Sequence, residues 1–132
     1  MSFNSYLHFD GDCEAAFKTY EKCFGGKLET MTFGSTPAGS SVPADWQNKL
    51  VHARLTSDQG TLMASDVPPG RYTKPQGFRV NVNTNDPAEA ERVYKELSPN
   101  GTIEMALQAT FWAKKFAMFT DRFGTPWMIN CE

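Results

Sequence analysis

The order of the elements that the sequence predicts repeats once along the chain, and this repeat constrains the fold more than any single motif. Apolar periodicity predicts a strand, a helix and three strands in the first half, at 5–9, 13–24, 27–33, 50–57 and 61–66. The second half repeats this order, with strands at 77–83, 102–109, 114–121 and 126–131 and a helix between Asp86 and Gly101. The halves share little sequence identity, so the matching order itself indicates a duplicated module.

Both predicted helices carry their own start and stop signals. Apolar residues recur at helical spacing from Cys13 to Phe24, after Asp12 as the expected N-cap and before a Gly-Gly pair. In the second helix a proline follows Asp86, at the first helical position where proline is favoured. We therefore expect each helix to bury one apolar face against the strands of its own module.

Two segments lie outside the repeat. Residues 34–48 are rich in Gly, Ser and Pro and predict a long loop, which is either a lid or interface element or a solvated connector pinned by its tryptophan. Residues 68–76 contain three prolines and predict a linker. We therefore expect a single domain over 1–132, in which this linker joins a module of about 1–67 to one of about 77–132.

Composition excludes several classes of partner. The net charge is −2 and no long basic run occurs, which argues against nucleic acid. No apolar run approaches the roughly 20 residues of a membrane span, and the N-terminus does not resemble a signal peptide. The three cysteines have no CxxC spacing. They predict buried thiols in a reducing compartment, and hence a cytoplasmic protein.

The closing stretch of the chain, an Asp-x-x-Gly turn between two strands, is its most specific motif. With the repeat, it resembles the PhnB-like branch of the vicinal oxygen chelate superfamily, which includes glyoxalase I, extradiol dioxygenases and bleomycin-binding proteins. This resemblance implies an α+β fold: two βαβββ modules forming a curved mixed sheet of half-barrels, with the helices outside. The segments that carry it are Tyr6-Leu7-His8-Phe9, Gly11-Asp12-Cys13-Glu14-Ala15-Ala16, Phe24-Gly25-Gly26-Lys27, His52-Ala53-Arg54-Leu55, Met63-Ala64-Ser65-Asp66, Ile103-Glu104-Met105-Ala106, Gln108-Ala109-Thr110-Phe111-Trp112-Ala113, Thr120-Asp121-Arg122-Phe123-Gly124 and Pro126-Trp127-Met128-Ile129-Asn130.

The resemblance also implies a metal ligand on each of four strands. Carried over position by position, these places fall near Asn4, Met63 or Ser65, Arg79 and Met128. Catalytic transition metals need imidazole, carboxylate or thiolate donors, and the fixed positive charge of Arg79 repels a cation. We therefore predict no superfamily metal and no cofactor. The alternative is a divalent metal at a relocated site, for which the available donors are His8, His52, Asp66 and Glu104.

Strand alternation predicts which side chains face away from the helices, into a concave cavity. His52 is the candidate general acid or base, because imidazole titrates near neutrality. Structural roles remain open for His8 and His52 as hydrogen-bonded strand residues, for Asp66 as a turn cap, and for Trp112 as a core or dimer anchor. The predicted ligand-binding residues are Tyr6, His8, Arg54, Arg79, Asn81, Gln108, Trp112, Met128 and Asn130.

This set is net positive and rich in hydrogen-bond donors, which favours a protein that binds a small polar or anionic metabolite without a metal. The alternative is a lyase, isomerase or dioxygenase-like enzyme that acts on a small oxygenated metabolite, through a relocated metal or through His52. A partner-binding module with a filled cavity is a third possibility. The methyltransferase label used for some PhnB-like proteins is disfavoured, because no G-x-G element joins a strand to a helix. By resemblance, we expect a homodimer.

Overall fold

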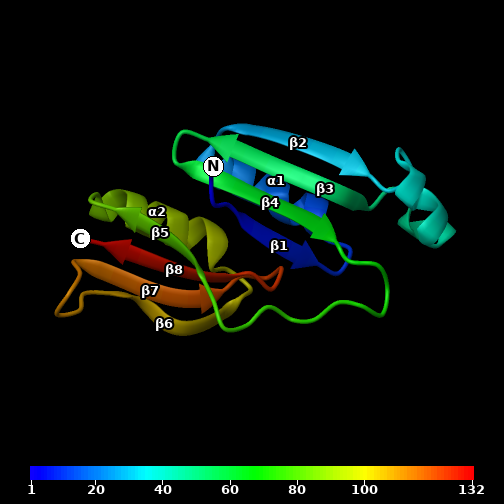
Figure 1. The fold of residues 1–132 in the computed structure, drawn as a ribbon. Helices are drawn as coiled ribbons and strands as arrows, with labels where there is room; N and C mark the ends of the chain where they lie inside the picture. The colour runs from blue at the N-terminus through cyan, green and yellow to red at the C-terminus, as the bar shows by residue number, and fades with distance from the viewer. The chain divides into compact units, whose positions relative to one another are not determined.

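The computed structural model describes residues 1–132, which divide into two compact units, Met1–Thr73 and Lys74–Glu132. Within the first unit, a strand, a helix and three strands follow one another (Figure 1): β1 (Ser5–Phe9), α1 (Cys13–Phe24), β2 (Lys27–Thr32), β3 (Leu50–Ser57) and β4 (Gly60–Asp66). The second unit has the same order: β5 (Val80–Thr84), α2 (Pro87–Leu97), β6 (Thr102–Gln108), β7 (Lys115–Thr120) and β8 (Pro126–Cys131). The predicted duplication is confirmed.

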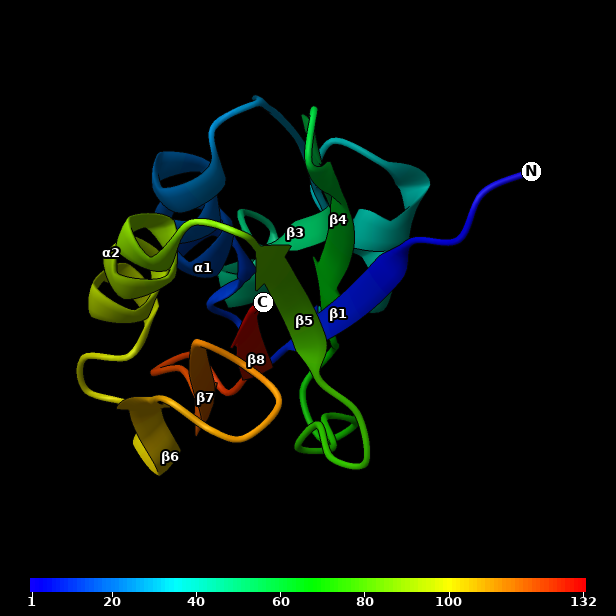
Figure 2. The same cartoon turned by 90° about the vertical axis from the view of Figure 1, so that its left-hand side faces the viewer.

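Each unit contains one four-stranded mixed sheet of the same topology. The strand orders are β1-β4-β3-β2 and β5-β8-β7-β6. In both sheets the first strand of the unit runs parallel to the last, and the remaining neighbours are antiparallel. Figures 1 and 2 show each helix along one side of its own sheet. The α+β class with open, curved sheets is therefore confirmed.

The core of each unit lies between its helix and one face of its sheet. In the first unit, Leu7, Phe9 and Leu55 pack beneath the rings of Phe17 and Tyr20, and all five side chains are almost fully buried. In the second unit the corresponding layer includes Phe119, Trp127 and Ile129 under α2, where the rings of Tyr94 and Phe119 meet edge to face at 5.7 Å. Burial of these side chains, worth about 25 cal/mol per Å² of apolar area, holds each helix in place.

The N-terminus of α1 is fixed by the last residue of β4, the strand that pairs with β1. Asp12 occupies the N-cap position, as expected, but its side chain makes no capping hydrogen bond. Instead, Oδ1 of the buried Asp66 accepts from the backbone N–H groups of Gly11 and Cys13, and its Oδ2 accepts from Leu50 N. Asp66 was left open between a turn cap and a metal donor, and these bonds give it the capping role.

Two predicted segments need correction. Residues 34–48 are not wholly irregular, because they contain two short 3-10 helices, Pro37–Ser41 and Ala44–Trp46. The ring of Trp46 lies 6.1 Å from that of Phe33, in agreement with the pinned connector. Strand β5 begins at Val80 rather than at 77, so Arg79 precedes the strand instead of lying within it.

Candidate ligand-binding faces of the two units

The face of each sheet that points away from its helix is called here the open face. On the open face of the first unit, one row of side chains crosses all four strands, with Tyr6, Met63, Arg54 and Glu29 directly opposite one another in turn. Burial supports this orientation, because Leu7 and Phe9 are buried in β1 whereas Tyr6 and His8 are exposed. The predicted inward direction of these residues therefore agrees with the structure.

Tyr6 brings the two histidines of the chain together. Its hydroxyl lies 3.3 Å from Nδ1 of His52, within hydrogen-bond distance. Its ring meets that of His8 edge to face at 5.6 Å, and the ring of His52 lies 6.0 Å away. Tyr6 itself is 44% exposed. A phenol and two imidazoles, each a donor and an acceptor, therefore share one patch of the open face.

Arg54 is the cation of this patch. It is exposed on β3 directly opposite Glu29, yet the two side chains form no ion pair within 4 Å. No other acidic group is paired with its guanidinium, so its donors remain available to a ligand. A guanidinium presents its N–H groups in a planar fork that matches a carboxylate or phosphate.

The open face of the second unit has a different composition. One row pairs Asn81 with Met128, Met128 with Met118, and Met118 with Met105. The next row pairs Asn83 with Asn130, Asn130 with Phe116, and Phe116 with Gln108. Three thioethers therefore lie side by side across three strands, next to a row of amides and one phenyl ring.

Arg79 is occupied by its own unit. Its Nη1 donates to the backbone carbonyls of Trp127 at 3.2 Å and Phe119 at 3.5 Å, and its Nη2 pairs with the Glu104 carboxylate. The Arg79 side chain is 26% exposed. The guanidinium that was predicted to bind a ligand is thus paired with a carboxylate of β6. This pairing weakens the case for Arg79 as an anion ligand and for Glu104 as a metal donor.

Two further predicted residues, Trp112 and Asn130, lie at the end of the amide row and within it. The ring of Trp112 meets that of Phe116 edge to face at 5.2 Å, so Trp112 borders the open face at its β6–β7 end. Asn130 donates to Glu132 through Nδ2 at 3.5 Å, but its Oδ1 is buried and has no hydrogen-bond partner. Together with Arg79, Asn81, Gln108 and Met128, they place six of the nine predicted ligand-binding residues in the second unit.

The residues at the superfamily metal positions do not fit a transition metal. They offer an amide, a thioether or hydroxyl, a guanidinium already paired with Glu104, and a second thioether. Among the alternative donors, Asp66 faces α1 and is occupied by three backbone N–H groups, on the opposite side of the sheet from His8. No group of three or more His, Cys, Asp or Glu side chains is placed to hold a metal.

The cysteines and the acidic turn residue are structural. All three thiols are buried and free, and burial, reinforced by the negative charge of Asp66, raises the pKa of Cys13. Oδ1 of Asp121 accepts from the backbone of Phe123 and Thr125, and Oδ2 accepts from Trp127 Nε1 at 2.8 Å. Asp121 therefore stabilises the turn that carries β8 and its open-face residues.

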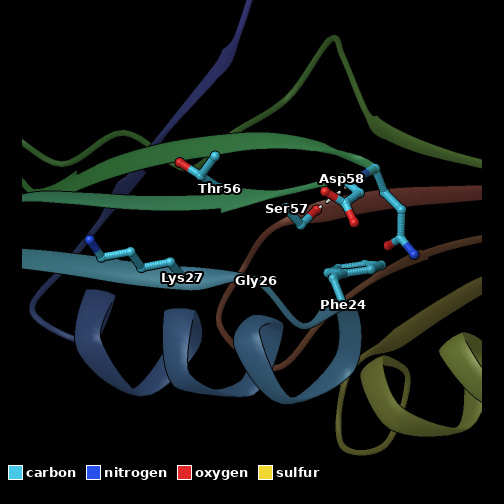
Figure 3. A pocket seen from close by; sticks show the side chains of 7 residues that line it. Phe24, Gly26, Lys27, Thr56, Ser57 and Asp58 are labelled. Carbon is cyan, nitrogen blue, oxygen red and sulfur yellow. Dashed lines mark hydrogen bonds between the residues drawn. The ribbon is translucent and has the colours of Figure 1, made fainter.

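A pocket of about 390 Å³ lies elsewhere in the first unit (Figure 3), where α1 ends and the β3–β4 hairpin turns. It is lined by Phe24, Gly26, Lys27, Thr56, Ser57, Asp58 and Gln59. A side chain at Gly26 would collide with the carbonyl of Thr56, which explains the glycine at this close approach. None of the predicted site residues lines this pocket.

Several open-face residues were missed by sequence reasoning. Met105, Met118 and Phe116 belong to the second unit, and Glu29 to the first. Alternation along β7 was a usable signal for Met118 and Phe116, since it places them on the other face of the sheet from the neighbouring Phe119 and Ala117. For Met105 no such signal existed, because β6 shifts register on both sides of it.

No helix is long and apolar enough to cross a membrane.

The chain matches known proteins over nearly its full length. It is 34% identical over 139 residues to Protein YjdN of Escherichia coli (strain K12), covering 98% of this chain and 95% of that protein. The crystal structure of protein PA1353 from Pseudomonas aeruginosa is 45% identical, with a TM-score of 0.90, and the match covers 100% of this chain and 98% of that one.

A PhnB protein from Bacillus cereus, described as a candidate 3-demethylubiquinone-9 3-methyltransferase, has a TM-score of 0.81 at 21% identity, with both chains fully covered. At that identity the likeness shows the fold alone. The model of the Glyoxalase/Bleomycin resistance protein/Dioxygenase superfamily matches residues 2–129. The chain therefore belongs to this superfamily, and its resemblance to a PhnB protein is confirmed at the level of the fold.

Proposed function

We propose that this protein binds a small anionic or polar metabolite on the open face of its first unit, without a metal. The observation that carries the proposal is the contrast between two arginines. Arg54 is exposed and forms no ion pair, whereas Arg79 is paired with Glu104 and with two backbone carbonyls. Among the predicted anion ligands, Arg54 is therefore the one whose donors are available.

The neighbours of Arg54 suit an oxygen-rich ligand. Met63 separates Arg54 from Tyr6 in the same cross-strand row, and Tyr6 contacts both His8 and His52. The guanidinium supplies a bidentate site for a carboxylate or phosphate. The phenol and imidazoles supply hydrogen bonds to the remaining oxygens, and Met63 supplies an apolar contact between them.

Thermal-shift measurements with malonate, pyruvate and inorganic phosphate test this proposal. A ligand that binds only the folded state raises Tm in proportion to its saturation. We expect at least one of these anions to raise the Tm of the unmodified protein, and Arg54→Met to remove that shift. The matched control, Arg79→Met, should retain it. An anion shift that survives Arg54→Met but is lost in Arg79→Met would overturn the assignment.

A second candidate function is acid–base catalysis on the same face. The hydrogen bond between the Tyr6 hydroxyl and Nδ1 of His52 favours it, because a hydroxyl partner orients an imidazole that exchanges a proton with a substrate. The test is to follow a bound anion by NMR over hours for any chemical change. Turnover that is lost in His52→Gln while binding persists would establish the enzyme. An unchanged ligand supports binding alone.

Superfamily members commonly dimerise and bind small molecules. We also propose that this chain forms a cytoplasmic homodimer. Light scattering coupled to size exclusion should report twice the 14.8 kDa chain mass, and a monomer mass would refute the dimer.

A further inference from the structure

We infer that the open face of the second unit binds a planar, uncharged heteroaromatic group that carries a hydrogen-bond donor on its edge. This site goes beyond the proposed function and does not depend on it, because it uses different residues in the other unit. Four features of that face carry the inference: a row of thioethers, an aromatic border, an acceptor without a partner, and the absence of a free arginine.

The thioethers supply a flat, polarisable floor. Met128, Met118 and Met105 occupy directly opposite positions on three adjacent strands. Neighbouring strands lie about 4.8 Å apart, so three consecutive residues in one row span roughly the width of a fused two-ring system. Thioether sulfur makes favourable contacts with aromatic rings. A side-by-side set of three therefore favours a flat ring over a charged or branched ligand.

The border on the β6–β7 side is aromatic. Phe116 lies in the row next to the thioethers, and Trp112 packs edge to face against it. Trp112 is 49% exposed, so part of the indole is available beyond this contact. Aromatic pairs prefer edge-to-face or offset geometry, which an added ring lying over the methionines and beside Trp112 would satisfy.

An unpaired acceptor, Oδ1 of Asn130, indicates which group the edge of the ligand should carry. Oδ1 of Asn130 is buried and has no hydrogen-bond partner, although Nδ2 of the same amide donates to Glu132. A buried acceptor that stays unpaired is destabilising, and a donor on a ligand relieves this once the Asn130 amide turns toward the open face. Because Asn130 lies directly opposite Phe116 in the row beside the thioethers, the complementary group is an N–H on the rim of the ring.

The charge of this face excludes an anion as the preferred group. Its arginine, Arg79, is neutralised by Glu104, and the other polar residues of the two rows are amides. The ligand group that fits is therefore neutral, in contrast to the anion proposed for the first unit.

Methyl-labelled methionine NMR tests the inference directly, because the chain has six methionines that single Met→Leu variants can assign. The probe is carbostyril, a planar two-ring lactam with one N–H. Ring currents should move the methyl signals of Met118 and Met128 upfield, while those of Met31 and Met63 in the first unit stay unchanged. The perhydro analogue of carbostyril, which keeps the N–H but has no aromatic ring, should cause no upfield shift.

Two further comparisons test the acceptor and the border. N-methylcarbostyril, which lacks the donor, should bind about tenfold more weakly than carbostyril, and Asn130→Ala should abolish that difference. Trp112→Ala should weaken both probes without unfolding the protein, since the indole is half exposed. The inference is overturned if Met118 and Met128 do not respond, if the perhydro analogue shifts them equally, or if the shifts appear at Met31 and Met63 instead.

Discussion

In the first unit the helix N-terminus is held by a carboxylate from the last strand, whereas in the second it is capped by its immediate neighbour. Asp66 bonds three backbone N–H groups from two separate segments, the start of α1 and the start of β3. Asp86 bonds Ala88 N, two residues away. At the sheet position that corresponds to Asp66, the second unit has the buried Cys131. The same topology therefore tolerates a long-range anchor or a local one.

The open faces differ more than the anchors do. Tyr6 and Met63 face each other as Asn81 and Met128 do, and Arg54 faces Met63 as Met118 faces Met128. The methionine is kept at this position in both units, but its neighbours change from a phenol and a cation to an amide and a thioether. On the helix side, both units retain an apolar layer. The fold requires apolar side chains on the face of the sheet that packs against the helix, and it allows the residues of the open face to differ between the units.

The largest expected effect comes from removing the long-range anchor, Asp66. Asp66→Ala leaves three backbone donors unpaired in a buried site and should lower the free energy of unfolding by about 3 kcal/mol. The matched change in the second unit, Asp86→Ala, removes an exposed N-cap and should cost about 1 kcal/mol. Urea unfolding of both variants provides the comparison. Equal losses would mean that the two anchors contribute alike.

The next effect concerns the turns between the last two strands of each unit. Asp121→Ala removes the acceptor of the Trp127 indole and of two turn N–H groups, and should destabilise the protein by about 2 kcal/mol. Ser57, at the same place in the first unit, makes exposed turn bonds, so Ser57→Ala should cost a few tenths of a kcal/mol. Thermal unfolding measures both, and a larger loss for Ser57→Ala would contradict the assigned roles.

A smaller effect separates the two arginines. Arg79→Met should cost about 1 kcal/mol, since it breaks a half-exposed ion pair and two bonds to carbonyls. Arg54→Met should be nearly neutral, because Arg54 has no ion pair to lose. Both values come from urea denaturation. A costly Arg54→Met would mean that its guanidinium has a structural partner.

The smallest effect is a dependence on pH. The hydrogen bond from Lys115 holds the pKa of Glu91 below its usual range, and Arg92 does the same for Glu89. A carboxylate with a lowered folded-state pKa contributes stability that is present above the unfolded pKa and lost as pH falls through the folded one. Glu91→Gln should therefore slightly flatten the acid limb of a curve of Tm against pH. An unchanged curve would mean that the Glu91–Lys115 pair does not contribute to stability.

Element order and most strand positions could be predicted from the sequence because each depends on local periodicity, although the start of β5 was placed three residues too early. The first unit's helix was placed at 13–24, and it spans Cys13–Phe24. Pairing between distant side chains could not be predicted. Glu104 lies 25 residues from Arg79, and Asp66 lies 53 residues from Cys13. These contacts depend on strand register and on a bulge in β6, which alternation alone does not specify.

The central claim is that Arg54, and not Arg79, supplies the cation for an anionic ligand. The most direct measurement is the NMR signal of each arginine Nε–H group during titration with the anion that gives the largest thermal shift. We expect the Arg54 signal to move and saturate with the ligand while the Arg79 signal stays in place. A response at Arg79 with Arg54 unchanged would contradict it.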